Sequence, residues 1–317
     1  MHIYNIYGLL FNSDIELPSA YEIAQAGNTD SKVMILKQEK LQTLYEKVSG
    51  AAQEYIKTEQ NITCLTEKED EMETIIHVLG IGSFRITDGK TIEYFKSEET
   101  DIYQFEQWIL NMAVSTCIIQ QGGIILHGSA LKYNDGLVII SGESGSGKST
   151  LTDVLLGDDR FKFASDDSVL LECGNEHIYG YGAYPLRRLC DDVVQNNKYD
   201  TEKLIYIPDN GREKYGLIMK ENYSPDAVRT DYLFILETGK QKEVSITEVT
   251  GSDKLGCILR SLYKNESYKR FGLTQDMMIQ CLKIASKLKI YHIIRPEKGM
   301  TGNIQRDKIF EVLNITG

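Results

Sequence analysis

The segment "GESGSGKS", from Gly142 to Ser149, places glycines, a lysine and a hydroxyl at the spacing G-x-x-x-x-G-K-S. Glycines let a backbone fold around a phosphate, and N–H groups at a helix N-terminus point toward the anion. The Lys148 ammonium is expected to reach the β- and γ-phosphates of a nucleotide, and the Ser149 hydroxyl to ligate Mg²⁺. The predicted nucleotide site comprises Gly142, Glu143, Ser144, Gly145, Ser146, Gly147, Lys148, Ser149 and Thr150.

The segments on either side of this loop favour a strand–loop–helix unit. The run "LVIIS" before the loop is apolar and β-branched, and a helix is predicted from Lys148 to about Leu156. A phosphate loop needs this arrangement, because the helix N-terminus must face the anion. The alternative is a glycine-rich turn with an incidental lysine.

Two adjacent carboxylates, Asp166 and Asp167, follow the segment "FKFAS" and precede "VLLE", so they are predicted to lie at a strand end or a sharp bend. Adjacent carboxylates repel each other unless a cation or a proton lies between them, which suits a metal site or a general base. A phosphate loop needs such a second acidic site for its metal. The alternative is a solvated acidic turn.

His127 ends a short predicted strand upstream of the loop. We expect this strand to pair next to the strand that feeds the loop, which would bring the imidazole near the γ-phosphate. There the ring could orient a metal-bound water, touch the metal or assist proton transfer. The alternative is a structural histidine that satisfies hydrogen bonds.

The elements that position these residues predict an α/β fold in two domains. Residues 1–100 form a small α+β domain, with a strand "KVMIL" and helical spacing over residues 41–48. In the segment "SFRITDGKTIEYF", apolar and polar residues alternate on both sides of Asp88-Gly89, which predicts a hairpin. This domain carries no chemical motif, so we expect it to shape or cover a site.

The second predicted domain spans residues 101–317. A buried helix over residues 101–121 starts it and stops at Gly122-Gly123. Strands around the loop and the acidic pair follow. The remaining predicted elements are a strand at Tyr232 to Glu237, helices near Leu255 to Tyr263 and Asp276 to Leu288, a strand "IYHII", and a helix near Ile309 to Leu313.

Composition narrows the function classes. The chain has 317 residues, of which 42% are hydrophobic and 26% charged, as in globular proteins. The net charge of −11 would repel nucleic acid and anionic membranes, so neither is a predicted partner. No apolar run approaches the roughly 18 residues that span a bilayer, and no signal peptide is evident, so we expect a cytoplasmic protein. The six cysteines lack C-x-x-C spacing, so no zinc site or disulfide framework is expected.

Together, "LHGSAL", "SGESGSGKSTL" and "SDD" resemble the HPr kinase and phosphoenolpyruvate carboxykinase superfamily of P-loop enzymes. Looser motifs, "YGLLFNSDIELP", "GYGAYPLRRLCDD" and "YHIIRP", are similar to HPr kinase-related proteins of peptide-modifying gene clusters, including kinases of lasso-peptide precursors. The resemblance implies that residues 101–317 form a P-loop kinase domain with a mixed sheet.

The resemblance also implies roles for the acidic pair. Mg-ATP would lie on the loop, and a serine hydroxyl would attack the γ-phosphate in line. One carboxylate of the Asp166/Asp167 pair would accept the hydroxyl proton, and the other would hold Mg²⁺. In the carboxykinase branch the second aspartate and the histidine bind the metal, which suggests Asp166 as the base and Asp167 and His127, together with Ser149, as metal ligands.

Arg187 and Arg188 lie where related kinases carry a conspicuous arginine. The resemblance implies that a guanidinium there clamps the transferred or substrate phosphate. The alternative is a pair of surface arginines that bind Asp191 and Asp192.

Departures from the family narrow the activity. The glycine-rich segment that bifunctional HPr kinase/phosphorylases carry after the acidic pair is not found, which puts HPr as substrate and phosphorolysis in doubt. The arginine and lysine motifs with which a carboxykinase binds oxaloacetate are not found either. A lyase is therefore disfavoured.

The leading hypothesis is a kinase that phosphorylates a serine hydroxyl of a peptide or protein, including a ribosomally made peptide precursor. The alternatives are a kinase for free serine or another small molecule, and a nucleotide-binding regulator without phosphotransfer. Transfer that is sensitive to Asp166→Asn separates the kinases from the regulator, because a switch needs no base. A homo-oligomer is left open.

Overall fold

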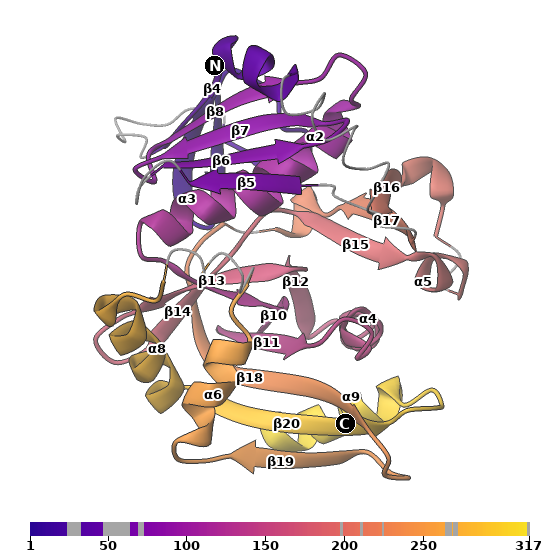
Figure 1. Cartoon of the computed structure of the whole chain (residues 1–317). Helices are drawn as coiled ribbons and strands as arrows, with labels where there is room; N and C mark the ends of the chain where they lie inside the picture. The colour runs from indigo at the N-terminus through magenta and orange to yellow at the C-terminus, as the bar shows by residue number, and fades with distance from the viewer. Residues whose placement is uncertain are drawn as a thin grey trace. The chain divides into compact units, whose positions relative to one another are not determined.

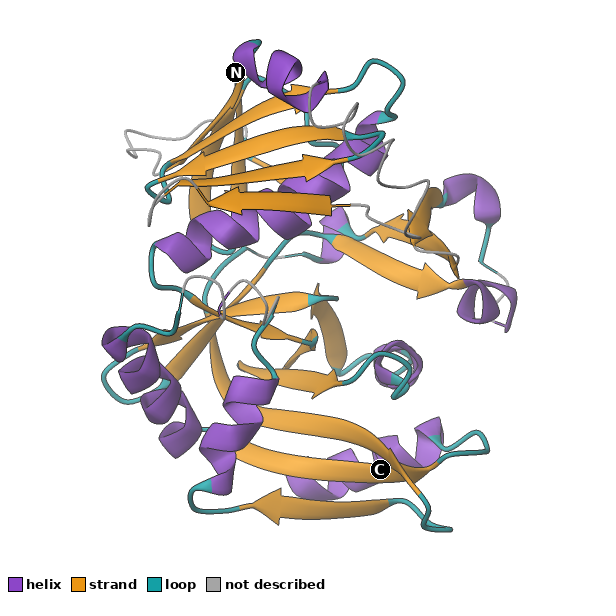
Figure 2. Ribbon diagram, viewed as in Figure 1, coloured by secondary structure: helices purple, strands orange, loops and turns teal. Residues whose placement is uncertain are grey.

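The computed structural model describes residues 1–23, 33–46, 64–68, 73–196, 199–209, 212–223, 225–263, 268 and 272–315. The chain divides into two compact units, Met1–Gly123 and Ile124–Gly317. Both contain helices and mixed sheets with parallel and antiparallel pairs (Figures 1 and 2). The α/β fold class is confirmed. The division falls after Gly123, whereas the sequence predicted a boundary after residue 100.

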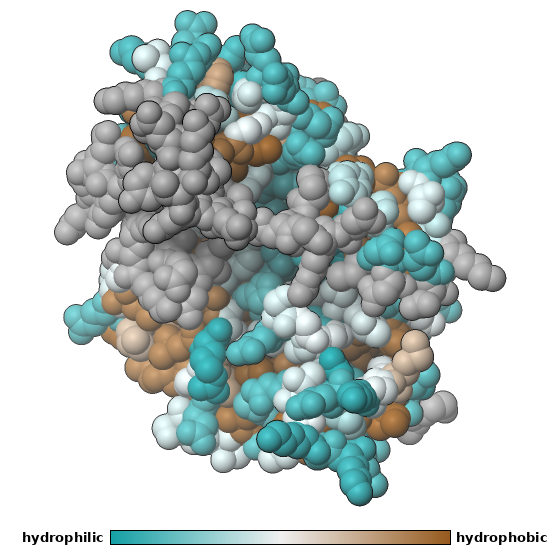
Figure 3. Space-filling model, turned by 45° about the vertical axis from the view of Figure 1, so that its right-hand side comes forward, coloured by the Kyte–Doolittle hydropathy of each residue, from teal (hydrophilic) through white to brown (hydrophobic). Residues whose placement is uncertain are grey.

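The surface is mixed in character. On the face drawn in Figure 3, hydrophilic residues surround smaller patches of apolar ones. In the part of the chain that the structure describes, no helix is long and apolar enough to cross a membrane. The exposed large apolar side chains among these residues are Met1, Tyr179, Tyr206, Ile279, Leu282, Met300 and Ile304.

Unit 1 is built on one sheet. Its strands are β1 (His2–Ile6), β2 (Leu9–Ser13), β3 (Tyr21–Glu22), β4 (Val33–Lys37), β5 (Cys64–Lys68), β6 (Glu73–Val78), β7 (Gly82–Thr87) and β8 (Thr91–Lys96). Their order is β3-β1-β2-β4-β8-β7-β6-β5. The predicted strand "KVMIL" is β4. The predicted helix over residues 41–48 is observed at residues 40–46, and Val48 lies outside the described residues.

The predicted hairpin is β7 and β8. Asp88 and Gly89 have φ angles of 53° and 60°, and the Lys90 N–H donates to the Thr87 carbonyl over 3.0 Å. A tight hairpin turn with positive φ at both central residues suits an Asp-Gly pair. The dipeptide therefore explains where the two strands reverse.

The predicted helix over residues 101–121 belongs to unit 1. It consists of α2 (Ile102–Trp108), a π-helical turn η1 (Ile109–Ala113) and α3 (Val114–Gln120), and Gly122 follows with a φ of 81°. Phe105 is fully buried, and its ring centroid lies 5.2 Å from that of Phe84 on β7 and 5.5 Å from that of Tyr94 on β8. This aromatic packing fastens the helix to the first sheet, which moves the division of the chain to Gly123.

Unit 2 contains the larger sheet, nine-stranded over the described residues. Its strands are β9 (Ile124–His127), β10 (Ser129–Tyr133), β11 (Gly136–Gly142), β12 (Phe161–Ser165), β13 (Ser168–Cys173), β14 (Ile178–Gly182), β18 (Val228–Gly239), β19 (Ser245–Val249) and β20 (Lys289–Pro296). The order is β12-β10-β11-β18-β14-β13-β9, with β20 paired to β18 and β19 to β20. Because β11, β18 and β20 are parallel, their carboxyl ends meet at one edge.

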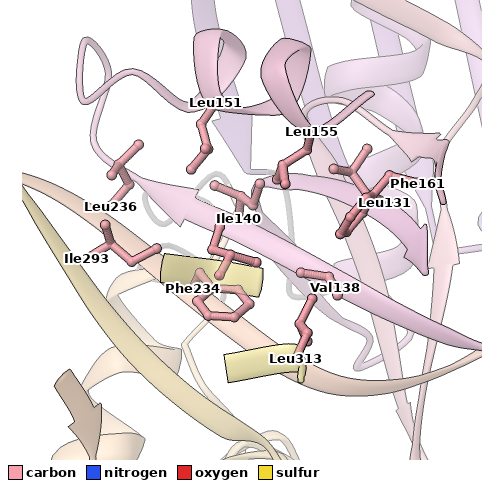
Figure 4. Close-up of a cluster of buried hydrophobic side chains, with 11 residues drawn as sticks. Leu131, Val138, Ile140, Leu151, Leu155, Phe161, Phe234, Leu236, Ile293 and Leu313 are labelled. Atoms are coloured by element: carbon pink, nitrogen blue, oxygen red, sulfur yellow. The ribbon is translucent and has the colours of Figure 1, made fainter. Parts of the chain in front are cut away.

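Helices cover both faces of this sheet. They are α4 (Lys148–Leu156), α6 (Asp253–Arg260), α8 (Gln275–Lys287) and α9 (Gly302–Leu313). Leu151 and Leu155 of α4 point onto Val138 and Ile140 of β11, with Leu313 of α9 in the same cluster (Figure 4). On β20, Ile293 belongs to this cluster, whereas the adjacent His292 contacts Cys257 of α6 over 3.4 Å. Adjacent strand residues face opposite sides, so α6 covers the other face.

The sheet curls back on itself at Gly128. This residue links β9, at one end of the strand order, to β10, near the other end. A Cβ at Gly128 would lie 2.7 Å from the Ile140 carbonyl oxygen, so a side chain here would clash with β11. The sequence predicted that β9 lies next to β11, the strand that feeds the phosphate loop, and this prediction is wrong. In the structure β9 pairs with β13, and His127 stands opposite Ser168. Curvature, which the sequence does not encode locally, brings His127 to the acidic bend instead.

A separate three-stranded sheet was not predicted. It has the order β15 (Leu186–Cys190), β17 (Arg212–Ile218) and β16 (Ile205–Asp209), and α5 (Asp191–Asn196), η2 (Thr201–Lys203) and η3 (Lys220–Asn222) lie beside it in the chain. Leu189 on β15 packs with Val193 and Val194 of α5 in a small core.

Candidate active site

The phosphate loop lies between β11 and α4, as predicted, and α4 has the predicted bounds. Gly142 has a φ of 149°, and a Cβ there would lie 2.3 Å from the Leu236 carbonyl oxygen. Gly147, with a φ of 101°, precedes the helix as its N-cap. These conformations form a cradle that residues with side chains could not follow without strain.

Two features of the loop fit a phosphate group. The first main-chain N–H groups of α4 lie at its N-terminus, next to the cradle. N–H groups in this position stabilise an anion. The Ser146 hydroxyl is buried, and within the described residues it has no hydrogen-bond partner. A buried hydroxyl in this condition is costly unless a ligand engages it.

Lys148 folds over the loop. Its ammonium donates to the carbonyl oxygens of Gly142, over 2.7 Å, and Glu143, over 3.1 Å. Burial lowers the pKa of Lys148, and the carboxylates of Asp167 and Asp166 oppose this effect. The lysine therefore lies in the electric field of the acidic pair, which joins the two predicted motifs in one site.

Asp166 and Asp167 form the bend between β12 and β13, as predicted. The Asp166 Oδ2 accepts from the Arg188 N–H over 2.7 Å, and the Ser129 hydroxyl lies 3.4 Å from Oδ1. Burial raises the pKa of the Asp166 carboxyl, and Arg188 partly offsets the rise. A carboxylate with a raised pKa is a better proton acceptor.

Asp167 is bound from three directions. Its Oδ2 pairs with the Arg188 guanidinium and accepts from the Tyr263 hydroxyl over 3.0 Å, and its Oδ1 lies 3.7 Å from His127 Nδ1. The side chain remains 27% exposed. Asp167 is thus the member of the pair that the Arg188 guanidinium and the Tyr263 hydroxyl bind directly.

His127 presents one nitrogen to this cluster. Its Nδ1 lies 3.1 Å from the Asp167 carbonyl oxygen, and its ring stacks on Tyr263 at 5.9 Å between centroids. Burial lowers the pKa of the imidazole, against the opposing effect of Asp167. Because a carbonyl oxygen can only accept, Nδ1 carries the proton of the neutral ring and Nε2 holds the lone pair. A neutral imidazole with a fixed tautomer is a suitable metal ligand.

The two neighbouring arginines separate. Arg188 reaches the acidic pair, while Arg187 is 3% exposed and pairs with Asp153 of α4 over 2.7 Å. Neither is a surface arginine, since the side chains of Arg187 and Arg188 are 4% and 18% exposed. The structure therefore brings Arg188 together with His127 and the acidic pair and directs Arg187 elsewhere.

Sequence reasoning missed three residues of this region. The Arg295 Nε donates to the Ser146 carbonyl over 2.7 Å, and its Nη2 to the Gly145 carbonyl over 3.3 Å, so it braces the phosphate loop. Tyr263 contacts both His127 and Asp167, and Ser129 donates to the Asp166 carbonyl over 2.8 Å. The available signal was "IIRP" at a strand end, since ligands of α/β sheets bind at the carboxyl ends of strands.

The donors available to a metal are few. Among the described residues, no group of three or more histidine, cysteine, aspartate or glutamate side chains could hold a metal ion. The predicted set of Ser149, Asp167 and His127 supplies one hydroxyl, one carboxylate and one imidazole. Mg²⁺ in nucleotide sites takes one or two protein carboxylates and completes its shell with phosphates and water, so this set fits Mg²⁺ with a nucleotide rather than a closed protein cage.

No protein-family model and no curated protein matches this chain. Among solved structures, the Hpr(Ser) kinase/phosphatase from Coxiella burnetii matches with 13% sequence identity and a TM-score of 0.31. The match covers 61% of this chain and 99% of that chain. The function of the site therefore has to be argued from its own residues.

Proposed function

We propose that the chain is an ATP-dependent kinase that transfers the γ-phosphate to a serine hydroxyl of a peptide or protein. The observation that carries the proposal is the meeting of a phosphate loop with a half-buried carboxyl in unit 2. Lys148 lies in the field of Asp166 and Asp167, and Asp166 has a raised pKa. A nucleotide site needs the loop, whereas transfer to an alcohol needs the added base.

Asp166 is the proposed base. The acceptor O–H bond breaks as its proton passes to Asp166, and a bond forms between the acceptor oxygen and the γ-phosphorus. The bond from that phosphorus to the β–γ bridging oxygen breaks, and ADP leaves. The Arg188 N–H holds Asp166 Oδ2, so the more weakly bonded Oδ1 faces the proton.

Lys148 and Arg188 supply the positive charge. Lys148 would exchange its bonds to the Gly142 and Glu143 carbonyls for phosphate oxygens, and Arg188 would neutralise charge beside Asp167. Ser149, Asp167 and His127 would hold Mg²⁺, which neutralises the phosphate oxygens when bound. Charge neutralisation of this kind is the main contribution that proteins make to phosphoryl transfer.

A peptide acceptor is the first choice. The motifs "YGLLFNSDIELP" and "GYGAYPLRRLCDD" resemble HPr kinase-related proteins of peptide-modifying clusters, which supports a ribosomally made precursor as substrate. The acidic net charge of −11 favours a basic peptide. We place the activity in the cytoplasm, where ATP is available.

The test uses labelled ATP. The chain is incubated with Mg²⁺, [γ-³²P]ATP and a set of serine-containing peptides with varied flanking residues. The same peptides with alanine for serine, and free serine, are run in parallel. Label that appears on the serine peptides alone supports the proposal. Label on free serine identifies a small-molecule kinase. Hydrolysis without transfer, unchanged by Asp166→Asn, identifies a regulator.

A further inference from the structure

Arg187 and Arg188 are adjacent on β15 and therefore point to opposite faces of the small sheet. Arg188 binds the acidic pair with both its side chain and its main-chain N–H. Arg187 is 3% exposed, so it is closed off from a substrate phosphate. The two arginines cannot share one role.

Arg187 is one corner of a closed network. Its Nη2 lies 2.7 Å from Asp153 Oδ1, and its Nη1 donates to the Tyr199 hydroxyl over 3.2 Å. The Tyr199 hydroxyl in turn donates to Asp153 Oδ1 over 3.2 Å. Each contact is directional, and the removal of Asp153 would leave the guanidinium of Arg187, whose side chain is 4% exposed, without its counter-charge. The network therefore fixes β15 at a definite position on α4.

Asp153 stands on the helix that begins at Lys148, while Arg188 stands next to Arg187 on the strand. The network thus joins α4, which follows the phosphate loop, to β15, whose Arg188 contacts the acidic pair. A shift of β15 against α4 would move the Arg188 N–H away from Asp166 Oδ2. Misplacement of a catalytic group by about 1 Å can reduce a rate on the order of 100-fold.

We propose that Arg187 is a positioning residue: through its buried contacts with Asp153 and Tyr199, it holds Arg188 on Asp166 and Asp167. The proposal rests on the proposed function for its consequence in catalysis. Its structural content, the fixing of β15 by α4, does not depend on that function.

The first experiment measures this structural content without catalysis. Amide hydrogen exchange is followed in Asp153→Asn, which is close in shape to the native side chain and removes only the charge. We expect exchange in residues 186–190 to rise about tenfold, because β15 is then held less firmly on α4 and the Arg188 N–H separates more often from Asp166 Oδ2. Exchange in β11 should stay unchanged. Asp231→Asn, in the exposed Arg229–Asp231 pair, is the matched control. Unchanged exchange in residues 186–190 overturns the proposal.

The second experiment separates positioning from direct contact. Arg187→Gln should lower kcat on the order of 100-fold and leave the KM for ATP within about twofold. Arg187→Lys, which keeps the charge, should recover part of the rate. Because Arg187 acts through Arg188, whose main-chain N–H remains in Arg188→Gln, the loss in the double variant should be smaller than the product of the two single losses. Effects that multiply, or a loss confined to KM, overturn the proposal. Arg229→Gln is the control.

The two experiments distinguish their failures. If the native chain transfers no phosphate, the proposed function fails, and the exchange experiment still decides whether Asp153 fixes β15. If transfer occurs and exchange in residues 186–190 does not respond to Asp153→Asn, the positioning role fails alone.

Discussion

One arginine in each unit holds two carboxylates. Arg85 on β7 lies 3.0 Å from Glu73 and 3.5 Å from Glu93. Arg188 on β15 pairs with Asp167 through its guanidinium and with Asp166 through its main-chain N–H. The arginine side chains have similar exposure, 29% for Arg85 and 18% for Arg188. The two clusters resemble each other as ion pairs, yet one of them carries the proposed chemistry.

The difference lies in what surrounds each cluster. The partners of Arg85 come from neighbouring strands of one sheet, where Arg85 stands directly opposite Glu93. The partners of Arg188 come from a bend in a different sheet, beside His127 and in the electric field of Lys148. A cross-strand ion pair stabilises a sheet. In the proposed site, distant elements add a phosphate loop and a half-buried carboxyl to the opposed charges.

The largest expected effect on the rate of phosphate transfer is at the phosphate loop, which has no counterpart beside Arg85. Lys148→Ala should reduce phosphate transfer on the order of 1,000-fold, because the charge that stabilises the transferred phosphoryl group is lost. The measurement is the initial rate with labelled ATP. Lys162→Ala, an exposed lysine on β12, should retain the rate. Equal rates in the two variants would break the distinction between the clusters.

The acidic pair comes next. Asp166→Asn and Asp167→Asn should each lower kcat by about 100- to 1,000-fold, the first through loss of the base and the second through loss of a metal ligand. Excess Mg²⁺ should partly restore Asp167→Asn and not Asp166→Asn. Glu73→Gln removes the corresponding carboxylate of unit 1 and should leave kcat unchanged. Near-native rates in the aspartate variants would contradict the assigned roles.

The arginines themselves give the direct comparison. Arg188→Gln should lower kcat on the order of 100-fold, because Asp167 loses its guanidinium partner and the charge that offsets the repulsion between the two carboxylates is removed. Arg85→Gln should leave kcat unchanged and lower stability by about 1 kcal/mol or less, as for other partly exposed pairs. Steady-state kinetics and urea unfolding measure the two effects. A similar loss of kcat in both variants would show that the clusters are not distinct.

The histidines sharpen the comparison further. His127→Ala should lower kcat about tenfold, less than either aspartate variant, since the imidazole only supplements a carboxylate. His2 in unit 1 also contacts a carboxylate, Glu22 at 2.8 Å, and His2→Ala should have no effect on kcat. A native rate for His127→Ala would return that residue to a structural role.

The smallest effect, on stability, is expected at a partly exposed ion pair outside the candidate site, Arg160 and Asp158. Hydrogen bonds from Arg160 lower the pKa of Asp158 to about 2. Since the folded-state pKa lies below the unfolded one, the pair stabilises the fold above about pH 4, and this contribution is lost as the pH falls toward 2. Asp158→Asn should lower the melting temperature by about 1–2 °C at pH 6. The difference should shrink between about pH 4 and pH 2; a constant difference contradicts the assignment.

Local patterns predicted most single elements. The Asp88-Gly89 turn, the strand before the phosphate loop, α4 and the bend at Asp166 depend on φ preferences and periodicity within a few residues. The neighbour of β9 was predicted wrongly, because strand pairing depends on how the whole sheet curls. The sheet of β15, β16 and β17 was missed because its short strands carry no distinctive alternation.

The candidate site divides in the same way. The phosphate loop and the acidic pair could be predicted from the sequence, because each is formed by consecutive residues. The contacts of Tyr263 and Arg295 could not be predicted. Tyr263 lies 96 positions beyond Asp167, and Arg295 lies 149 positions beyond Ser146 of the phosphate loop. Their roles follow from contacts that exist only after the sheet has formed.

By itself, the sequence determined the phosphate loop from Gly142 to Ser149, the helix that follows it and the adjacent carboxylates, because short-range geometry and residue type specify them. The tertiary structure alone decided that β9, which carries His127, pairs with β13 and that Arg188, not Arg187, reaches the acidic pair. Sheet curvature and the alternation of side chains along β15 set these contacts. Both depend on the packing of distant segments, for which no short stretch of sequence carries the information.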